Sequence, residues 1–88
     1  MIGHLATSKA GHDKDRLYVI VGQEGDFVYL CDGCLKSPDK PKKKRVKHIQ
    51  IIRDTVDEPL LGRLLAGEKV YGEEIRYAIT LYRRRSKA

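Results

Sequence analysis

Basic side chains crowd into one short stretch of this sequence. Residues 36–48 read KSPDKPKKKRVKH and carry seven Lys or Arg against a single Asp. The net charge of this stretch is +6, which equals the formal net charge of all 88 residues, so the rest of the chain is electrically balanced. A compact cationic block on an otherwise neutral protein is typical of a surface that binds a polyanion.

Three interpretations of the run PKKKRV and the lysine that follows it stay open at this stage. In a strand or an extended loop, about three of these cations can face one phosphate backbone and drive affinity by releasing counterions. The same letters match a short basic signal for nuclear import. A solvated loop would explain the run without any partner. We favour phosphate contact, because strand-like segments flank the run on both sides.

Cys31 and Cys34 have the C-x-x-C spacing of metal and redox motifs. A zinc site needs about four ligands, and the sequence offers no second cysteine pair, while His4, His12 and His48 stand at no recognisable spacing from the first. We therefore predict no metal site and no cofactor, and we expect the two cysteines to face each other across a hairpin turn. A metal or redox role is the alternative.

Neither catalysis nor membrane insertion is indicated by the sequence. It lacks a Ser-His-Asp arrangement, a plausible pair of carboxylates and a phosphate-binding glycine loop, so we predict a binding protein and not an enzyme. Apolar runs stay well below the roughly 20 residues that span a bilayer, and the first residues lack the long apolar stretch of a signal peptide. We expect a cytoplasmic protein without a membrane partner.

Short strand-like segments fill the first 53 residues. Residues 17–21 and 27–31 are dense in β-branched and aromatic side chains, and residues 46–52 alternate in polarity. Between them, Asp-Gly at 32–33 predicts a two-residue hairpin turn that leads directly into a returning strand. Such a short strand-rich chain must close on itself to hide its edges, so we predict a small barrel over residues 1–53.

The apolar period changes to that of helices in residues 54–88. Asp57-Glu58-Pro59 predicts a helix start, and Gly67 predicts its end. A second helix is predicted over residues 72–85, with acidic residues at its beginning and arginines at its end. The apolar positions are Leu60, Leu61, Leu64 and Leu65 in the first helix and Ile75, Ala78, Ile79 and Tyr82 in the second. We predict that the two helices pack as a hairpin against the barrel, away from the basic run.

The segment SKAGHDKDRLYVIVG, residues 8–22, resembles the KOW motif of small RNA-binding barrels. That motif has a glycine, a turn with basic and acidic residues, a second glycine and then alternating hydrophobic residues. The pair DG at 32–33 and the tripeptide KHI at 47–49 extend the match. Over residues 2–52 the spacing is similar to that of bacterial KOW-domain RNA-binding proteins, which are related to a large-subunit ribosomal protein of eukaryotes and archaea. The sequence departs from the motif at Asp15, where the pattern has glycine.

The resemblance implies an SH3-like KOW barrel that binds structured RNA, above all ribosomal RNA, in translation or ribosome assembly. Ribosomal proteins are further expected partners. The alternative is a protein-interaction module that docks to a ribosomal or transcription complex through its leucine stripe. Tyr18 and Tyr29 either stack on bases or pack in the core, and the basic cluster at 83–87 either extends the RNA surface or complements its helix. The predicted RNA-binding residues are Lys9, His12, Lys14, Arg16, Lys40, Lys42, Lys43, Lys44, Arg45 and Lys47.

Overall fold

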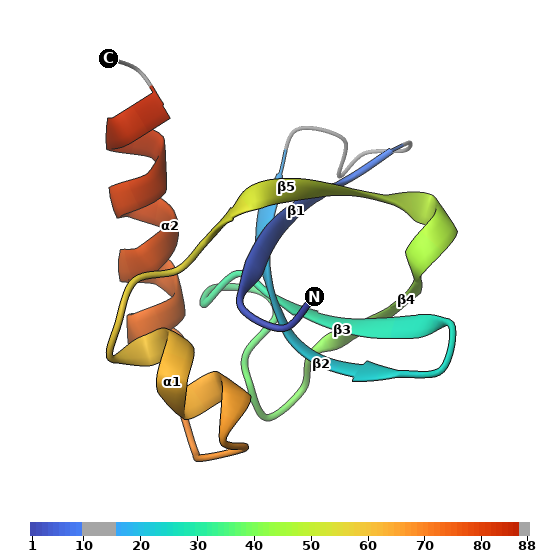
Figure 1. The fold of residues 1–88 in the computed structure, drawn as a ribbon, viewed down its shortest axis with the longest axis horizontal. Coiled ribbons are helices and arrows are strands. Elements are labelled where there is room, and N and C mark those ends of the chain that lie inside the picture. The colour runs from blue at the N-terminus through green and yellow to red at the C-terminus, as the bar shows by residue number, and fades with distance from the viewer. Residues whose placement is uncertain (10–15, 87–88) are drawn as a thin grey trace.

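One antiparallel sheet and two helices make up the protein in a computed structural model that describes residues 1–9 and 16–86 (Figure 1). The five strands follow the order β4-β3-β2-β1-β5 across the sheet. They are β1 (His4–Ser8), β2 (Leu17–Glu24), β3 (Phe27–Cys31), β4 (Lys42–Arg45) and β5 (Ile49–Thr55), and they are followed by α1 (Leu60–Leu65) and α2 (Gly72–Ser86). The prediction of a mainly β protein with two C-terminal helices is confirmed.

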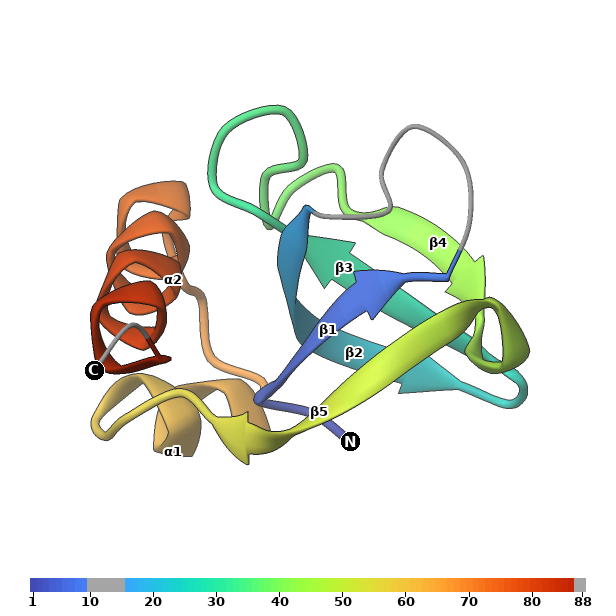
Figure 2. The same ribbon diagram turned by 90° about the horizontal axis from the view of Figure 1, so that it is seen from above.

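The sheet curves strongly, so its two edge strands approach each other at one end (Figure 2). A short 3-10 helix, η1 (Val46–His48), joins β4 directly to β5. Two contacts hold this corner: the Lys44 ammonium donates to the Ser8 hydroxyl at 2.8 Å, and the Val46 N–H donates to the Asp26 carbonyl at 2.8 Å. The first contact links β4 to β1, which lie on opposite sides of β2 and β3 in the strand order.

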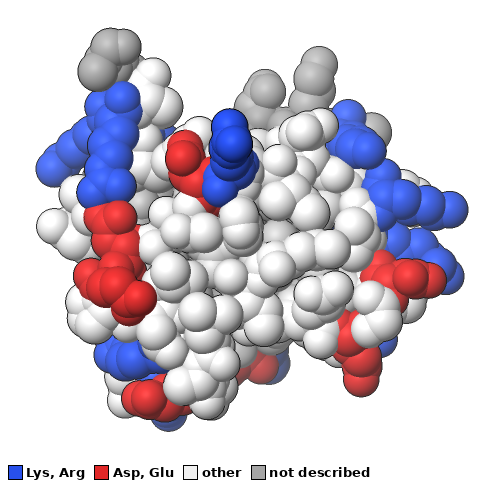
Figure 3. All heavy atoms as spheres, viewed as in Figure 1, with Lys and Arg blue, Asp and Glu red and all other residues white. Residues whose placement is uncertain are grey.

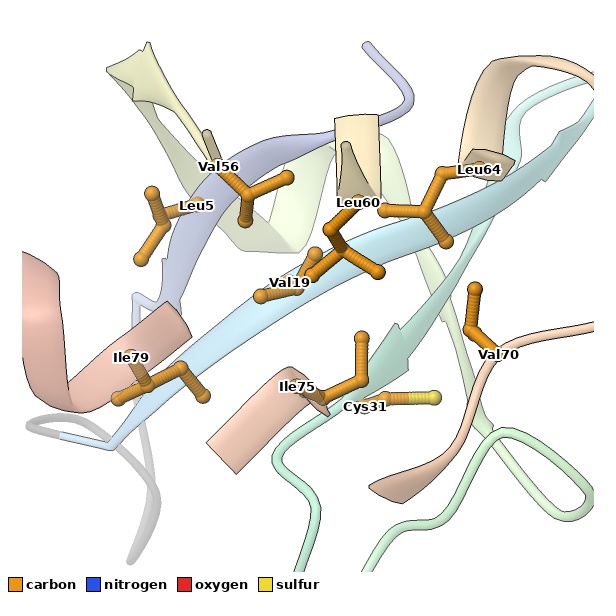
Figure 4. Packing of buried hydrophobic residues seen from close by; sticks show 9 residues of the cluster. All are labelled: Leu5, Val19, Cys31, Val56, Leu60, Leu64, Val70, Ile75 and Ile79. Atoms are coloured by element: carbon orange, nitrogen blue, oxygen red, sulfur yellow. The ribbon is translucent and has the colours of Figure 1, made fainter. Parts of the chain in front are cut away.

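Each face of the sheet carries its own hydrophobic cluster. Because side chains alternate along a strand, β2 directs Tyr18 and Ile20 to an inner cluster and Val19 to an outer one. The inner cluster contains Ala6, Tyr18, Ile20, Val28, Leu30 and Ile49. The outer cluster joins the sheet to the helices and contains Leu5, Val19, Cys31, Val56, Leu60, Leu64, Val70, Ile75 and Ile79 (Figure 4).

The helices pack against the outer face, far from β4, as predicted (Figures 1 and 2). Helix α1 is followed by Gly67, which has a φ of +74° that favours glycine. In the first turn of α1 the Glu58 carboxylate accepts from the Gly62 N–H at 2.8 Å. Ion pairs join Arg63 to Glu74 and Arg85 to Asp57. The sheet and the helices thus share one core, and the predicted division of the chain at residue 53 stays a prediction.

The predicted hairpin after β3 is wrong. The connection to β4 spans residues 32–41, because the Asp32 carboxylate accepts from the backbone N–H groups of Cys34, at 2.8 Å, and Lys36, at 2.9 Å, and folds the chain into a wide loop. Gly33 has the positive φ that glycine favours, +80°, but it lies against helix α2, where an added Cβ would come within 2.3 Å of the Gly72 carbonyl oxygen.

The two cysteines do not face each other. Cys31 ends β3 with no exposed surface inside the outer cluster, whereas Cys34 is exposed in the loop that follows. Burial, and after it the charge of Asp32, raises the pKa of the Cys31 thiol to about 12. The Cys31 thiol is therefore protonated at neutral pH and behaves as an apolar core group.

Two predicted strand limits also differ from the structure. The expected strand over residues 46–52 begins as η1 and becomes extended only at Ile49, after which it continues to Thr55. Strand β2 runs on to Glu24, because the pairing with β3 shifts register between Ile20 and Gly22 and lets the strand continue through the glycine. In the described part of the chain, neither helix has the length and apolar character needed to cross a membrane.

Candidate nucleic-acid interface

The basic run forms β4, an edge strand of the sheet. Lys42, Lys43, Lys44 and Arg45 pair in order with Leu30, Tyr29, Val28 and Phe27 of β3. Lysine on an edge strand also discourages strand-to-strand aggregation, so the composition alone does not establish a binding role. The direction of each side chain is more informative.

Lys43 and Arg45 lie on the outer face of β4 and are exposed. The Lys43 ammonium stands 4.6 Å from the centre of the Phe27 ring, and the Arg45 guanidinium carbon stands 4.8 Å from the same centre. Cation–π contacts at exposed sites stabilise by about 0.5–1 kcal/mol each. The half-buried Phe27 ring therefore holds two cations side by side on the surface.

Lys42 and Lys44 are directed to the inner face of the sheet and are half-buried. The Lys44 ammonium donates to Ser8, a residue only 4% exposed, and the Lys42 ammonium lies 5.9 Å from the centre of the Tyr18 ring. The alternation of the strand thus divides four consecutive cations into an exposed outer pair, which lies over the Phe27 ring, and a half-buried inner pair directed toward Ser8 and Tyr18.

One carboxylate lies among the outer cations. Glu24 ends β2, and its side chain approaches the Lys43 ammonium to 3.7 Å and accepts from the Tyr29 hydroxyl at 3.0 Å. This hydrogen bond, followed by desolvation and by the charge of Glu24, raises the pKa of Tyr29 above its usual value. Both members of the Lys43–Glu24 pair are about half exposed or more, so the pair itself contributes little to stability.

The other predicted site residues spread around this strand. Lys9 is exposed at the end of β1, where its N–H donates to the His48 carbonyl at 3.1 Å, so it adjoins η1 and the exposed Lys47. Lys40 is exposed in the connection before β4. Arg16 lies before β2 with its guanidinium 3.5 Å from the Asp32 carboxylate. His12, Lys14 and the rest of the motif turn lie outside the described residues.

Basic side chains gather on the side of the molecule where β4 lies, and a mostly uncharged surface, interrupted by one group of basic and acidic side chains, lies between them and the arginines at the end of α2 (Figure 3). Arg85 is paired with Asp57, while Arg83 and Arg84 are exposed. Among residues 1–9 and 16–86, no group of three or more His, Cys, Asp or Glu side chains is placed to hold a metal ion.

The predictions named Tyr29 but missed Phe27 and Glu24 as parts of this surface. Tyr18, left open between stacking and packing, is buried in the inner cluster, whereas Tyr29 is half-buried beside Lys43. The spacing of Phe27 and Tyr29 was a usable signal, because alternate residues of one strand share a face. Their pairing with the cations was hidden by the wrong hairpin, which placed another segment beside β3.

No family model matches the sequence, and no curated protein shows a significant match to it. We therefore base the functional proposal on the chemistry and geometry of β4 and its neighbours.

Proposed function

We propose that this protein binds RNA, with the outer cations of β4 contacting phosphates, and that its role is binding and not catalysis. The curved sheet with η1 between its edge strands supports an SH3-like barrel of the KOW type. The resemblance of residues 8–22 to the KOW motif supports ribosomal RNA as the target, in the cytoplasm and in contact with other ribosomal components.

The observation that carries this proposal is the outer pair of cations over the Phe27 ring. Residues two apart on one strand are about 6.6 Å apart, so Lys43 and Arg45 present their charges to one backbone as a row. Phosphate contacts of this kind supply most of the affinity of sequence-independent binding. The planar Arg45 guanidinium also offers a surface on which an unpaired base can stack.

The structure disfavours the two other interpretations of PKKKRV. An import signal is recognised as an accessible peptide, whereas residues 42–45 of this segment are paired to β3 and the chain continues into η1. A purely solvated run would leave all its cations in water, whereas two of them are half-buried and each of the four contacts a side chain of the protein.

The alternative function, docking of a partner protein through the leucine stripe, loses its proposed contact. Leu60 and Leu64 are buried in the outer cluster, and only Leu65 is largely exposed, at 62%. A different apolar surface favours a protein partner, and it is described in the next subsection.

Salt dependence of RNA binding tests the proposal. A labelled fragment of structured ribosomal RNA is titrated with the protein in a filter-binding assay at several KCl concentrations. We expect saturable binding. The logarithm of the association constant should fall linearly with the logarithm of the KCl concentration, because phosphate contacts release counterions. Absence of saturable binding at about 50 mM salt, or an affinity that does not change up to about 200 mM, would contradict an electrostatic RNA interface.

A further inference from the structure

A groove of about 530 Å³ runs between helix α2 and the chain that leads from β5 into α1. Its lining is mostly apolar, with Leu5, Val56, Leu60 and Ala78 among the residues at its floor and Tyr77 and Leu81 along α2. The volume lies in the range of about 300–1,000 Å³ that is typical of binding sites in proteins. For a chain of 88 residues this is a large hollow.

Helix α2 has a second apolar stripe that the core does not use. Ile75 and Ile79 face the outer cluster and are at most 5% exposed. Tyr77, which is 63% exposed, and the half-buried Leu81 follow each other at i and i+4 on the neighbouring side of the helix and line the groove. An apolar stripe beside a hollow is the usual form of a surface that takes a partner.

The charges around the groove favour a positive partner. Two ion pairs, Arg63 with Glu74 and Arg85 with Asp57, join α2 to the opposite wall. The lining also contains the carboxylates of Asp54 and Glu58, both exposed, so its acidic groups exceed its basic ones by two. A net negative lining is notable on a protein whose net charge is +6.

We propose that this groove binds a basic amphipathic segment of a partner protein. Its apolar side chains fill the hollow beside Tyr77 and Leu81, and its Lys or Arg residues meet Asp54 and Glu58. Helix α2 and the chain between β5 and α1, which line the groove, lie on the side of the molecule opposite β4 (Figures 1 and 2), so RNA and the partner segment occupy separate surfaces. The inference does not depend on RNA binding.

Fluorescence anisotropy with a defined probe tests the proposal. The probe is a fluorescein-labelled helical peptide built only of Leu and Lys, with Leu at i, i+3, i+4 and i+7. The whole protein is cationic and therefore repels this cationic peptide at long range. Saturable binding then reports a local acidic and apolar site. We expect binding with a dissociation constant below about 100 µM.

Two leucine variants locate the site. Leu81→Lys places a charge in the groove and should weaken binding of the peptide at least about tenfold. Leu65→Lys makes the same chemical change on α1 at a leucine outside the groove lining, and it should bind like the unmodified protein. Circular dichroism of both variants confirms that the fold is kept.

A third variant tests the charge preference. Asp54→Asn with Glu58→Gln removes the two excess charges and should weaken binding about threefold to tenfold. No binding of the Leu/Lys peptide below about 100 µM would overturn the proposal. Equal affinities of the two leucine variants, or an unchanged affinity after neutralisation of the two carboxylates, would overturn it as well. Each result is independent of whether RNA binds at β4.

Discussion

Two double variants on one strand separate the outer cations of β4 from the inner ones. Lys43→Ser with Arg45→Ser removes two charges from the outer face, and Lys42→Ser with Lys44→Ser removes two from the inner face. The variants have the same net charge and the same number of serines. Because both variants lose two positive charges from the same strand, a difference in RNA binding between them measures local contact and not overall charge.

The magnitude follows from the number of phosphates contacted. Each contact contributes about 0.7–0.9 to the slope of log affinity against log salt, so the outer variant should flatten this slope by about 1.4–1.8. Its affinity should fall about 100-fold at about 50 mM salt and about tenfold at about 200 mM. The inner variant should change the slope by less than about 0.5, because the Lys44 ammonium is engaged by Ser8.

Both double variants should lose some stability. The inner variant loses the hydrogen bond between Lys44 and Ser8, and the outer variant loses two cation–π contacts with Phe27 of about 0.5–1 kcal/mol each, so both should unfold at a lower urea concentration than the unmodified protein. Filter binding at several KCl concentrations and urea denaturation followed by circular dichroism supply the two measurements. Equal salt slopes for the two double variants would refute the assignment of phosphate contacts to the outer face.

Three further predictions concern the core and the ion pairs. Ile75→Ala should destabilise the fold by about 2–5 kcal/mol in urea denaturation, because a fully buried side chain leaves a cavity; a loss below about 1 kcal/mol would show that α2 does not pack on the sheet. Iodoacetamide near neutral pH should modify Cys34 alone, since burial raises the pKa of Cys31 to about 12, and mass spectrometry should show a second adduct only after unfolding. The hydrogen bond and charge of Arg85 lower the pKa of Asp57, so Asp57→Asn should lower the free energy of unfolding at neutral pH. The difference in stability between the variant and the unmodified protein should vanish as the pH falls from about 3.9 through the lower pKa of the folded protein, and a difference that persists in acid would contradict this.

The spacing and type of apolar residues predicted helices and strands well where no other local preference competed with them. Strand β3 matches the expected residues 27–31, and α1 and α2 lie where the leucine and isoleucine spacing placed them. In the two helices a single face is buried, so the repeat of apolar residues reports the structure directly, whereas β3 was predicted from its β-branched and aromatic residues. The buried face of α2 is another such case, because Ile75 and Ile79 sit on it as predicted.

Prediction failed where a side chain competes with a turn preference. The Asp-Gly pair favours a two-residue hairpin, yet the Asp32 carboxylate binds two N–H groups further along and organises a longer loop. Gly33 is needed there for its approach to α2, a contact between residues far apart in the sequence. Local rules do not contain such a contact, and the same error hid the pairing of Phe27 with Arg45, on which the candidate interface depends.

Strand β2 is covered on both of its faces, and this has a consequence for the order in which the protein can be completed. Its inner neighbours all come from residues 6–51, whereas the residues that cover Val19 on the outer face include Ile75 and Ile79. A ribosome delivers the chain from its N-terminus, so a nascent sheet holds Leu5, Val19 and Cys31 open to water until the last quarter of the sequence emerges. During that interval the growing chain exposes an apolar surface to which other chains can bind, and the packing of α2 buries it.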